Sequence, residues 1–299
     1  MSTPIEPVAP KTYADFAPND APPPRDVNPD NPPWNVWGGT GLWLASVALM
    51  IVCQALFLVP YLVRQGVSAK DLGEFSTTNP MAVFLQVVSL IPAHLLTLGV
   101  AWLIVTRIGK RPFFASLGWE WAGPFTFWRS AGLAVFLLLV GMGVIYLEGN
   151  PETPLDKVIN SSRATAIAAA CLATFTAPLV EEVVYRGVLY SALQRAIGAA
   201  WAVVIVLALF ALVHVPQYIT SLGVIFTILM LSTILTLIRA RTGKLLPCFV
   251  IHLVFNGIQS LFIVASPYLQ RFAPQAPQAP PPDPALALLW LARLAGSQF

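Results

Sequence analysis

The residues best suited to chemistry are charged and polar side chains that occur inside long apolar stretches of the chain. Glu181 and Glu182 are adjacent in one such stretch, and Arg186 follows Glu182 by four residues. On a helix this spacing places Glu182 and Arg186 on one face, where they can form an ion pair. Glu181 points about 100° away from Glu182 and has no such partner. The pattern therefore predicts one neutralised glutamate and one glutamate that is free to act on another group.

Two further apolar stretches each contain a pair of residues at the same spacing. His214 follows Phe210 by four residues, and Asn256 follows His252 by four. Because polar groups on membrane helices face one another rather than lipid, we expect Glu181 to meet these side chains in one cavity. A carboxylate, two imidazoles and a carboxamide can together activate water. An ion or proton pathway is the main rival, and each group alone could instead be a structural ion pair or an interhelical hydrogen bond.

The composition identifies the elements that must position these groups. The 299 residues are 57% hydrophobic and only 10% charged, with a formal net charge of +3. A soluble domain has about 25% charged residues, so the composition excludes a water-soluble globular enzyme, a disordered chain and a nucleic-acid-binding protein with a basic face. It predicts an all-α membrane protein, a bundle of seven or eight transmembrane helices with a polar intramembrane cavity. Seven stretches are long enough to span, near residues 40–63, 81–106, 130–147, 164–190, 199–217, 219–238 and 246–266.

The chain divides into four parts by composition. Residues 1–38 form a proline-rich arm predicted to be disordered, residues 39–163 the N-terminal transmembrane helices, and residues 164–266 the transmembrane core with the candidate site. Residues 267–299 form a second proline-rich tail, whose apolar segment 285–295 is expected to lie at the membrane interface because it is too short to span. Lys and Arg are more frequent in the loops on the N-terminal side, which favours a cytoplasmic N-terminus. We expect an integral protein of a bacterial inner membrane.

Whether the polar groups can meet depends on two prolines in the helices that carry them. Pro178 lies one turn before Glu182 and is expected to disturb the helix there. His214 lies near the end of its predicted span, on the order of 10 Å from the depth of Glu181, unless its helix is tilted or continues past Pro216. His94 is expected to form only a structural or interhelical hydrogen bond.

The three motifs resemble those of the CPBP family, the CAAX proteases and bacteriocin-processing enzymes that are also called the Abi family. That family is marked by E-E-x-x-x-R, then F-x-x-x-H, then H-x-x-x-N, on separate transmembrane helices. The matching residues occur here in the same order: Glu181, Glu182 and Arg186, then Phe210 and His214, then His252 and Asn256. The resemblance covers about residues 164–265.

This resemblance implies an intramembrane endopeptidase, related to the type II CAAX prenyl endopeptidases, that hydrolyses a peptide bond of a membrane-associated protein or peptide. It implies that Glu181 and His214 activate the hydrolytic water, and that His252 and Asn256 stabilise the oxyanion. Three residues would support the site without acting on the substrate: Glu182, Arg186 and Phe210.

The family is often described as metalloproteases, so the sequence was also considered for a metal site. Glu181, His214 and His252 could hold Zn²⁺ with water in an open position. However, the chain has no H-E-x-x-H motif, and Asn256 is a poor zinc ligand. We therefore favour a mechanism without a cofactor, with zinc as the alternative.

Two other classes of function compete with the protease. A non-catalytic membrane scaffold or a bacteriocin self-immunity factor could share the same fold, but neither needs all four polar groups. A transporter predicts internal repeats, and none is visible. The expected partners are membrane lipid and a membrane-anchored protein or peptide substrate, not nucleic acid. The sequence does not fix the oligomeric state or whether the substrate is prenylated.

Overall fold

The computed structural model describes residues 28–269, which fold almost entirely into helices. Two segments, η2 and η3, are π-helical, with about one residue more per turn than an α-helix. In chain order the elements are α1 (Val36–Gln65), α2 (Leu72–Thr78), α3 (Pro80–Val88), α4 (Leu90–Thr106), α5 (Phe113–Ser116), α6 (Phe127–Glu148), α7 (Pro154–Asn160), α8 (Arg163–Cys171), η2 (Leu172–Thr176), α9 (Ala177–Glu181), η3 (Glu182–Leu189), α10 (Tyr190–Ile197), α11 (Ala199–Tyr218), α12 (Leu222–Thr242) and α13 (Leu246–Leu269).

Seven helical stretches are long and apolar enough to cross a membrane, in agreement with the seven spans predicted from the sequence. The first, third, fifth, sixth and seventh are formed by α1, α6, α11, α12 and α13. The second consists of α3 and α4, separated at Ser89, and Pro92 lies in the first turn of α4, where its missing N–H is tolerated. The fourth runs from Arg163 to Ile197 as the continuous series α8, η2, α9, η3 and α10.

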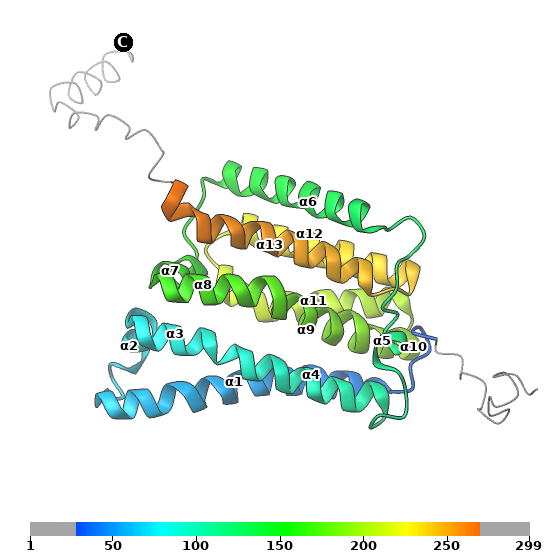
Figure 1. Ribbon diagram of the computed structural model, residues 1–299, viewed down its shortest axis with the longest axis horizontal. Helices are drawn as coiled ribbons and strands as arrows, with labels where there is room; N and C mark the ends of the chain where they lie inside the picture. Colours follow the sequence, from blue (N-terminus) through cyan, green and yellow to red (C-terminus); the bar gives the residue numbers. More distant parts are fainter. Residues whose placement is uncertain (1–27, 270–299) are drawn as a thin grey trace, which may run out of the picture.

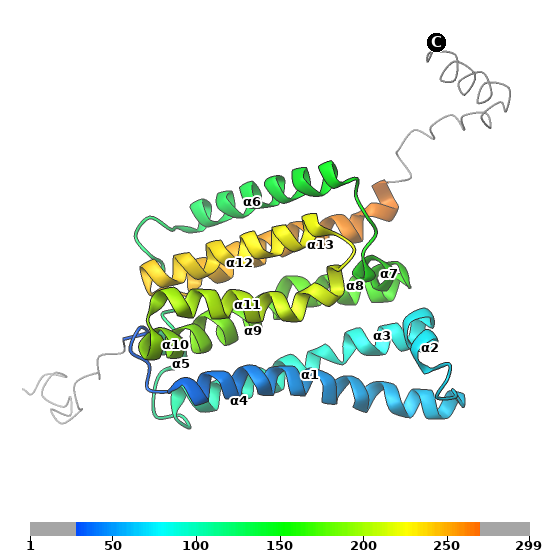
Figure 2. The same cartoon turned by 180° about the vertical axis from the view of Figure 1, so that it is seen from behind.

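The fourth span lies at the centre of the bundle (Figures 1 and 2). Its π-helical segments contact α1, α4, α11, α12 and α13, so helices from both halves of the chain surround it. On one side α4 and α1 pack together, and on the other α6 packs against both α12 and α13. The fourth span is therefore positioned to present side chains to several other helices at once.

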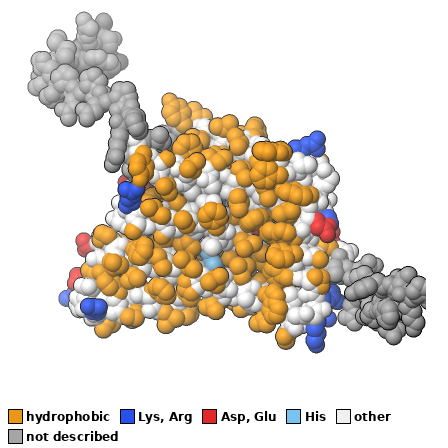
Figure 3. Space-filling model, viewed as in Figure 1, with side chains coloured by type: hydrophobic (Ala, Val, Ile, Leu, Met, Phe, Trp, Pro, Cys, Tyr) orange, Lys and Arg blue, Asp and Glu red, His pale blue; other side chains and the backbone are white. Residues whose placement is uncertain are grey.

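The outer surface of the bundle is apolar, whereas several charged side chains are inside it. Figure 3 shows hydrophobic side chains over most of one face, with Lys, Arg, Asp and Glu gathered at its two ends. Large apolar side chains such as Leu56, Phe136 and Leu212 are more than half exposed. Glu182 and Arg186, in contrast, are fully buried. Lipid must cover such an exterior, and the protein is an integral membrane protein.

Only parts of the two proline-rich segments, 1–38 and 267–299, lie within the described structure. The first helix begins at Val36, and residues 28–35 lie within the described structure, although residues 1–38 were expected to be disordered. Asn35 caps this helix by accepting a hydrogen bond from the Gly38 amide. Residues 1–27, the tail 270–299 and its predicted interfacial segment 285–295 lie outside the described residues.

Candidate active site

The fourth span departs from regular α-helix twice, once before the α-helical turn that carries Glu181 and again from Glu182 onward. Pro178 has no amide hydrogen, and in an α-helix its ring would press on the carbonyl of Thr174, four residues earlier. The π-helical segment η2, Leu172–Thr176, precedes this proline and widens the backbone at that point. The second π segment, Glu182–Leu189, begins at the second glutamate. Pro178 signals the first irregularity in the sequence, whereas no comparable signal marks the second.

Glu182 and Arg186 form the predicted ion pair. Arg186 Nη1 donates to Glu182 Oε1 at 3.1 Å, and both side chains are fully buried. The rest of the guanidinium is bonded to α12: Nη2 donates to Ser232 Oγ at 2.6 Å and Nε donates to Thr236 Oγ1 at 3.3 Å. A buried charge pair is tolerated when hydrogen bonds satisfy its remaining donors and acceptors. Each guanidinium nitrogen has a partner here, whereas Glu182 Oε2 is buried without one among the described residues. Glu182 is therefore committed to structural contacts.

His252, on α13, is oriented by the same carboxylate. Its Nδ1 lies 2.8 Å from Glu182 Oε1. Because the Arg186 guanidinium already donates to this carboxylate oxygen, we assign the shared proton to the imidazole, so that Nδ1–H donates and Glu182 accepts. The other ring nitrogen, Nε2, lies 3.7 Å from Glu181 Oε2. The second glutamate thus directs the lone pair of His252 toward the first glutamate.

His214, on α11, is oriented in the same way by a backbone carbonyl. Its Nδ1 lies 2.8 Å from the carbonyl oxygen of Phe210, which can only accept, so Nδ1 carries the proton. The Nε2 atom lies 3.9 Å from Glu181 Oε1. The predicted mismatch in depth is absent, because α11 continues past Pro216 to Tyr218 and brings His214 beside Glu181.

Phe210 fixes His214 and covers Arg186. Its ring stacks on the imidazole with centroids 4.3 Å apart, and the Arg186 guanidinium lies 4.7 Å from the ring centroid. The Tyr185 ring packs edge-on against Phe210 at 5.1 Å, and Trp43 Nε1 donates to the Tyr185 hydroxyl at 3.0 Å. Phe210 therefore supports the site through its aromatic face.

Glu181 lies between the two imidazoles and is 21% exposed. Separations of 3.7 and 3.9 Å are too long for direct hydrogen bonds. A water molecule at a hydrogen-bond distance of about 2.8 Å can bind both atoms of a pair separated in this way. The arrangement can hold a water between a carboxylate base and a ring nitrogen that accepts its hydrogen bond.

Asn256 lies one turn after His252 on α13. Its Nδ2 donates to the carbonyl of Ala173, in η2, at 3.0 Å. This bond ties the seventh span to the fourth beside the site and leaves the second amide hydrogen for another acceptor. The carboxamide therefore joins these two spans, as expected for a group that faces the bundle interior.

His94, on α4, makes the predicted interhelical hydrogen bond. Its Nδ1 lies 2.9 Å from Thr176 Oγ1. Because the Thr176 hydroxyl donates to the Leu172 carbonyl, it accepts from His94. His94 therefore links α4 to η2 of the fourth span.

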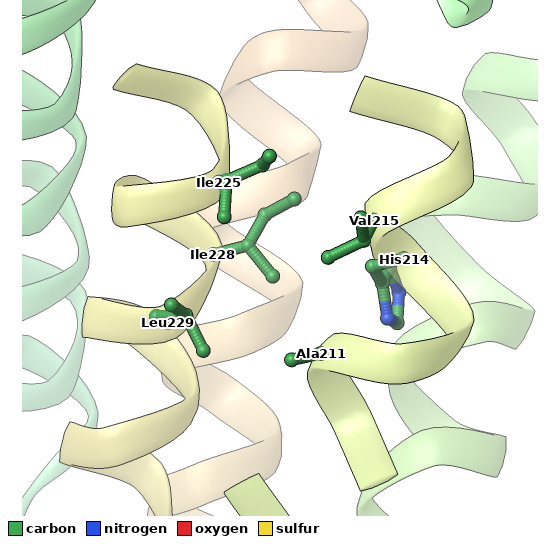
Figure 4. A pocket seen from close by; sticks show the side chains of 6 residues that line it. All are labelled: Ala211, His214, Val215, Ile225, Ile228 and Leu229. Carbon is green, nitrogen blue, oxygen red and sulfur yellow. The ribbon is translucent and has the colours of Figure 1, made fainter. Parts of the chain in front are cut away.

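A small hollow beside His214 lies between α11 and α12 (Figure 4). Apart from the imidazole, the side chains around it are apolar: Ala211, Val215, Ile225, Ile228 and Leu229. The edge of the site between these two helices is therefore suited to apolar groups.

A metal centre requires several ligand side chains that lie close together with suitable geometry. Within residues 28–269, no group of three or more His, Cys, Asp or Glu side chains is arranged to hold a metal. Glu181, His214 and His252 are neighbours, but as they lie they do not form a ready metal centre. The reaction proposed for this site therefore uses side chains and water alone.

Comparison with known proteins agrees with the motif resemblance. Residues 163–258 match the family model described as Rce1-like, type II CAAX prenyl endopeptidase. The matched segment begins at the fourth span and includes all three motifs. No curated protein and no solved structure matched the chain.

Proposed function

Because residues 163–258 match the Rce1-like type II CAAX prenyl endopeptidases, we propose that this protein is an intramembrane endopeptidase that cleaves a membrane-anchored protein or peptide. The observation that carries the proposal is the position of Glu181 between the Nε2 atoms of His214 and His252. The Nδ1 atoms of these rings are bonded elsewhere, to the Phe210 carbonyl and to Glu182 respectively. This arrangement leaves one carboxylate and two lone pairs directed at the same space. We infer from it that these groups act together as one site.

The proposed reaction uses Glu181 as general base. Water bound between Glu181 and His214 Nε2 attacks the carbonyl carbon of the scissile peptide bond, and Glu181 takes one of its protons. The carbonyl oxygen becomes an oxyanion, to which the free amide hydrogen of Asn256 donates. His252 adds a second donor when its Nε2 carries a proton. The C–N bond then breaks, and Glu181 returns its proton to the leaving amine.

The substrate is proposed to be a CAAX-type peptide at the membrane surface. The family match supports this substrate class. We further propose a bacterial inner membrane location with the N-terminus in the cytoplasm, because basic residues concentrate on that side.

The test is cleavage of a quenched, farnesylated CAAX-type peptide by the purified protein in lipid. Loss of a general base lowers the rate about 10²- to 10⁴-fold, so Glu181→Gln should abolish most of the activity. Glu152→Gln is the matched control, because Glu152 is exposed and lies outside the site. No cleavage by folded wild type would reject this substrate class and favour the scaffold or immunity function.

A chelator separates the two mechanisms that the sequence left open. The cofactor-free reaction predicts that prolonged treatment with a zinc chelator leaves the cleavage rate unchanged. Loss of activity that added Zn²⁺ restores would instead favour zinc bound by Glu181, His214 and His252.

A further inference from the structure

A short segment before the first helix, residues 28–34, lies across the end of the bundle where α4, α10 and α12 come together. We call this segment the N-terminal strap; in Figure 1 it lies beside α5 and α10. Three arginines donate to it, one directly after α4, one in α10 and one in α12. Arg107 donates to the Pro33 carbonyl, Arg195 to the Pro32 carbonyl, and Arg239 to the Pro29 carbonyl and to Asp30 Oδ1.

The surface under the strap is shaped by glycines. Gly118 and Gly243 have φ angles of +71° and +66°, a region that favours glycine. A Cβ atom on Gly118 would lie 2.3 Å from the Gly243 carbonyl oxygen and 3.2 Å from Pro29 Cγ. On Gly243 it would lie 2.9 Å from Asp30 Oδ2. The strap is therefore seated on backbone that admits no larger residue.

Two side chains connect this strap to the π-helical segment of the candidate site. Trp34 is buried, and its Nε1 donates to the carbonyl of Val188 at 3.0 Å. Arg239 is fully buried, and its Nε donates to the carbonyl of Arg186 at 3.1 Å while its other nitrogens bind the strap. Both acceptors belong to η3, the segment that begins at Glu182.

These bonds act where the backbone is irregular. The hydrogen bonds of a π-helical turn run over five residues, and this geometry is rare outside functional sites. Relaxation to an α-helix would change the direction of the side chains that follow Glu182. Arg239 and Trp34, which lie outside the fourth span, donate to the carbonyls of Arg186 and Val188. These hydrogen bonds favour the π-helical backbone over a regular α-helix.

We propose that Arg239 and Trp34, held by the N-terminal strap, are positioning residues for the active site. Arg239 holds the backbone of Arg186, the Arg186 side chain holds Glu182, and Glu182 orients the ring of His252. The strap thus acts on the site through a continuous chain of contacts. The predicted effect on the reaction rests on the proposed protease function, whereas the effect on His252 does not.

The test compares Arg239→Gln and Trp34→Phe with matched controls. Arg241→Gln changes an exposed arginine on the same helix, and Trp37→Phe changes a tryptophan that is 82% exposed. The first readout is kcat and KM for the CAAX-type peptide. We expect Arg239→Gln to lower kcat about tenfold with KM within about twofold, Trp34→Phe to lower kcat less, and both controls to match wild type.

The second readout is independent of catalysis. The chain has three histidines, so nitrogen NMR of protein labelled in its histidine rings gives few signals. We expect the Nδ1 signal of His252 to shift in Arg239→Gln and Trp34→Phe, with that of His94 unchanged. If Arg239→Gln does not fold, Asp30→Asn is the alternative, because it weakens only the bond between the strap and Arg239. It should shift the Nδ1 signal of His252 by a smaller amount than expected for Arg239→Gln.

Folded variants with wild-type kcat and an unchanged His252 signal would overturn the positioning role. A folded wild-type protein that does not cleave the CAAX-type peptide would reject the proposed substrate class, and the His252 signal would still decide whether the strap positions the site. The two failures are therefore distinguishable.

Discussion

The buried ion pair gives the sharpest prediction about stability. Arg186→Met removes the guanidinium and leaves the Glu182 carboxylate buried with His252 as its neighbour. Glu182→Leu leaves the guanidinium buried with only hydroxyl and carbonyl partners from α12. The double variant removes both charges and retains apolar volume.

The expected magnitudes follow from the complete burial of both side chains. Removing one partner of a buried pair costs about 3–5 kcal/mol, because the other charge stays buried without compensation. Replacing both partners by apolar residues is often nearly neutral. The double variant should therefore be more stable than either single variant, with a coupling of about 3 kcal/mol or more.

The assay is the free energy of unfolding in lipid–detergent micelles, followed by tryptophan fluorescence during denaturant titration. All three variants should also lose cleavage activity, because each disturbs the Nδ1 contact that orients His252. A double variant whose destabilisation equals the sum of the two single effects would refute the buried pair as the central contact of this helix.

Three further substitutions test separate parts of the structure. Phe210→Leu keeps an apolar side chain but removes the aromatic face on which the imidazole and guanidinium lie. We expect kcat to fall about three- to tenfold. The control Phe262→Leu, on the exposed face of α13, should leave kcat unchanged. Asn256→Ala removes an oxyanion donor and should lower kcat about 10²- to 10³-fold with little change in KM, and an unchanged rate would exclude that role. Gly141→Val places a Cβ 2.5 Å from a threonine methyl on α12 and should destabilise the bundle by about 1–3 kcal/mol. In the control Gly143→Val, the new Cβ meets nothing within 4 Å. Equal melting temperatures of the two variants would contradict the packing of α6 on α12.

The number of spans and the ion pair within the first motif could be predicted from the sequence, because apolar length and helical spacing act locally. Spacing alone indicated that Glu182 pairs with Arg186 and that Glu181 is free, and the structure has the pair at 3.1 Å. It also indicated that polar groups on separate helices would face one another, and His214 and His252 both reach Glu181.

Contacts between distant segments were not predictable in this way. The strap was assigned to a disordered arm because its prolines and acidic residues resemble a linker, yet arginines more than 70 residues away bind its carbonyls. His94 has no partner at helical spacing, so its hydrogen bond to Thr176 depends on how α4 packs on the fourth span. The π-helical segment that begins at Glu182 has no local sequence signal, and its carbonyls accept hydrogen bonds from distant side chains.

The measurement that tests the central claim most directly is a single turnover of the peptide substrate in ¹⁸O-labelled water, followed by mass spectrometry of product and protein. If Glu181 activates water, the label appears in the new carboxylate of the product and not in Glu181. Label in the Glu181 side chain would show that Glu181 attacked the substrate and that water opened the resulting anhydride at the glutamyl carbon, and the account of a water held between Glu181 and His214 would then be wrong.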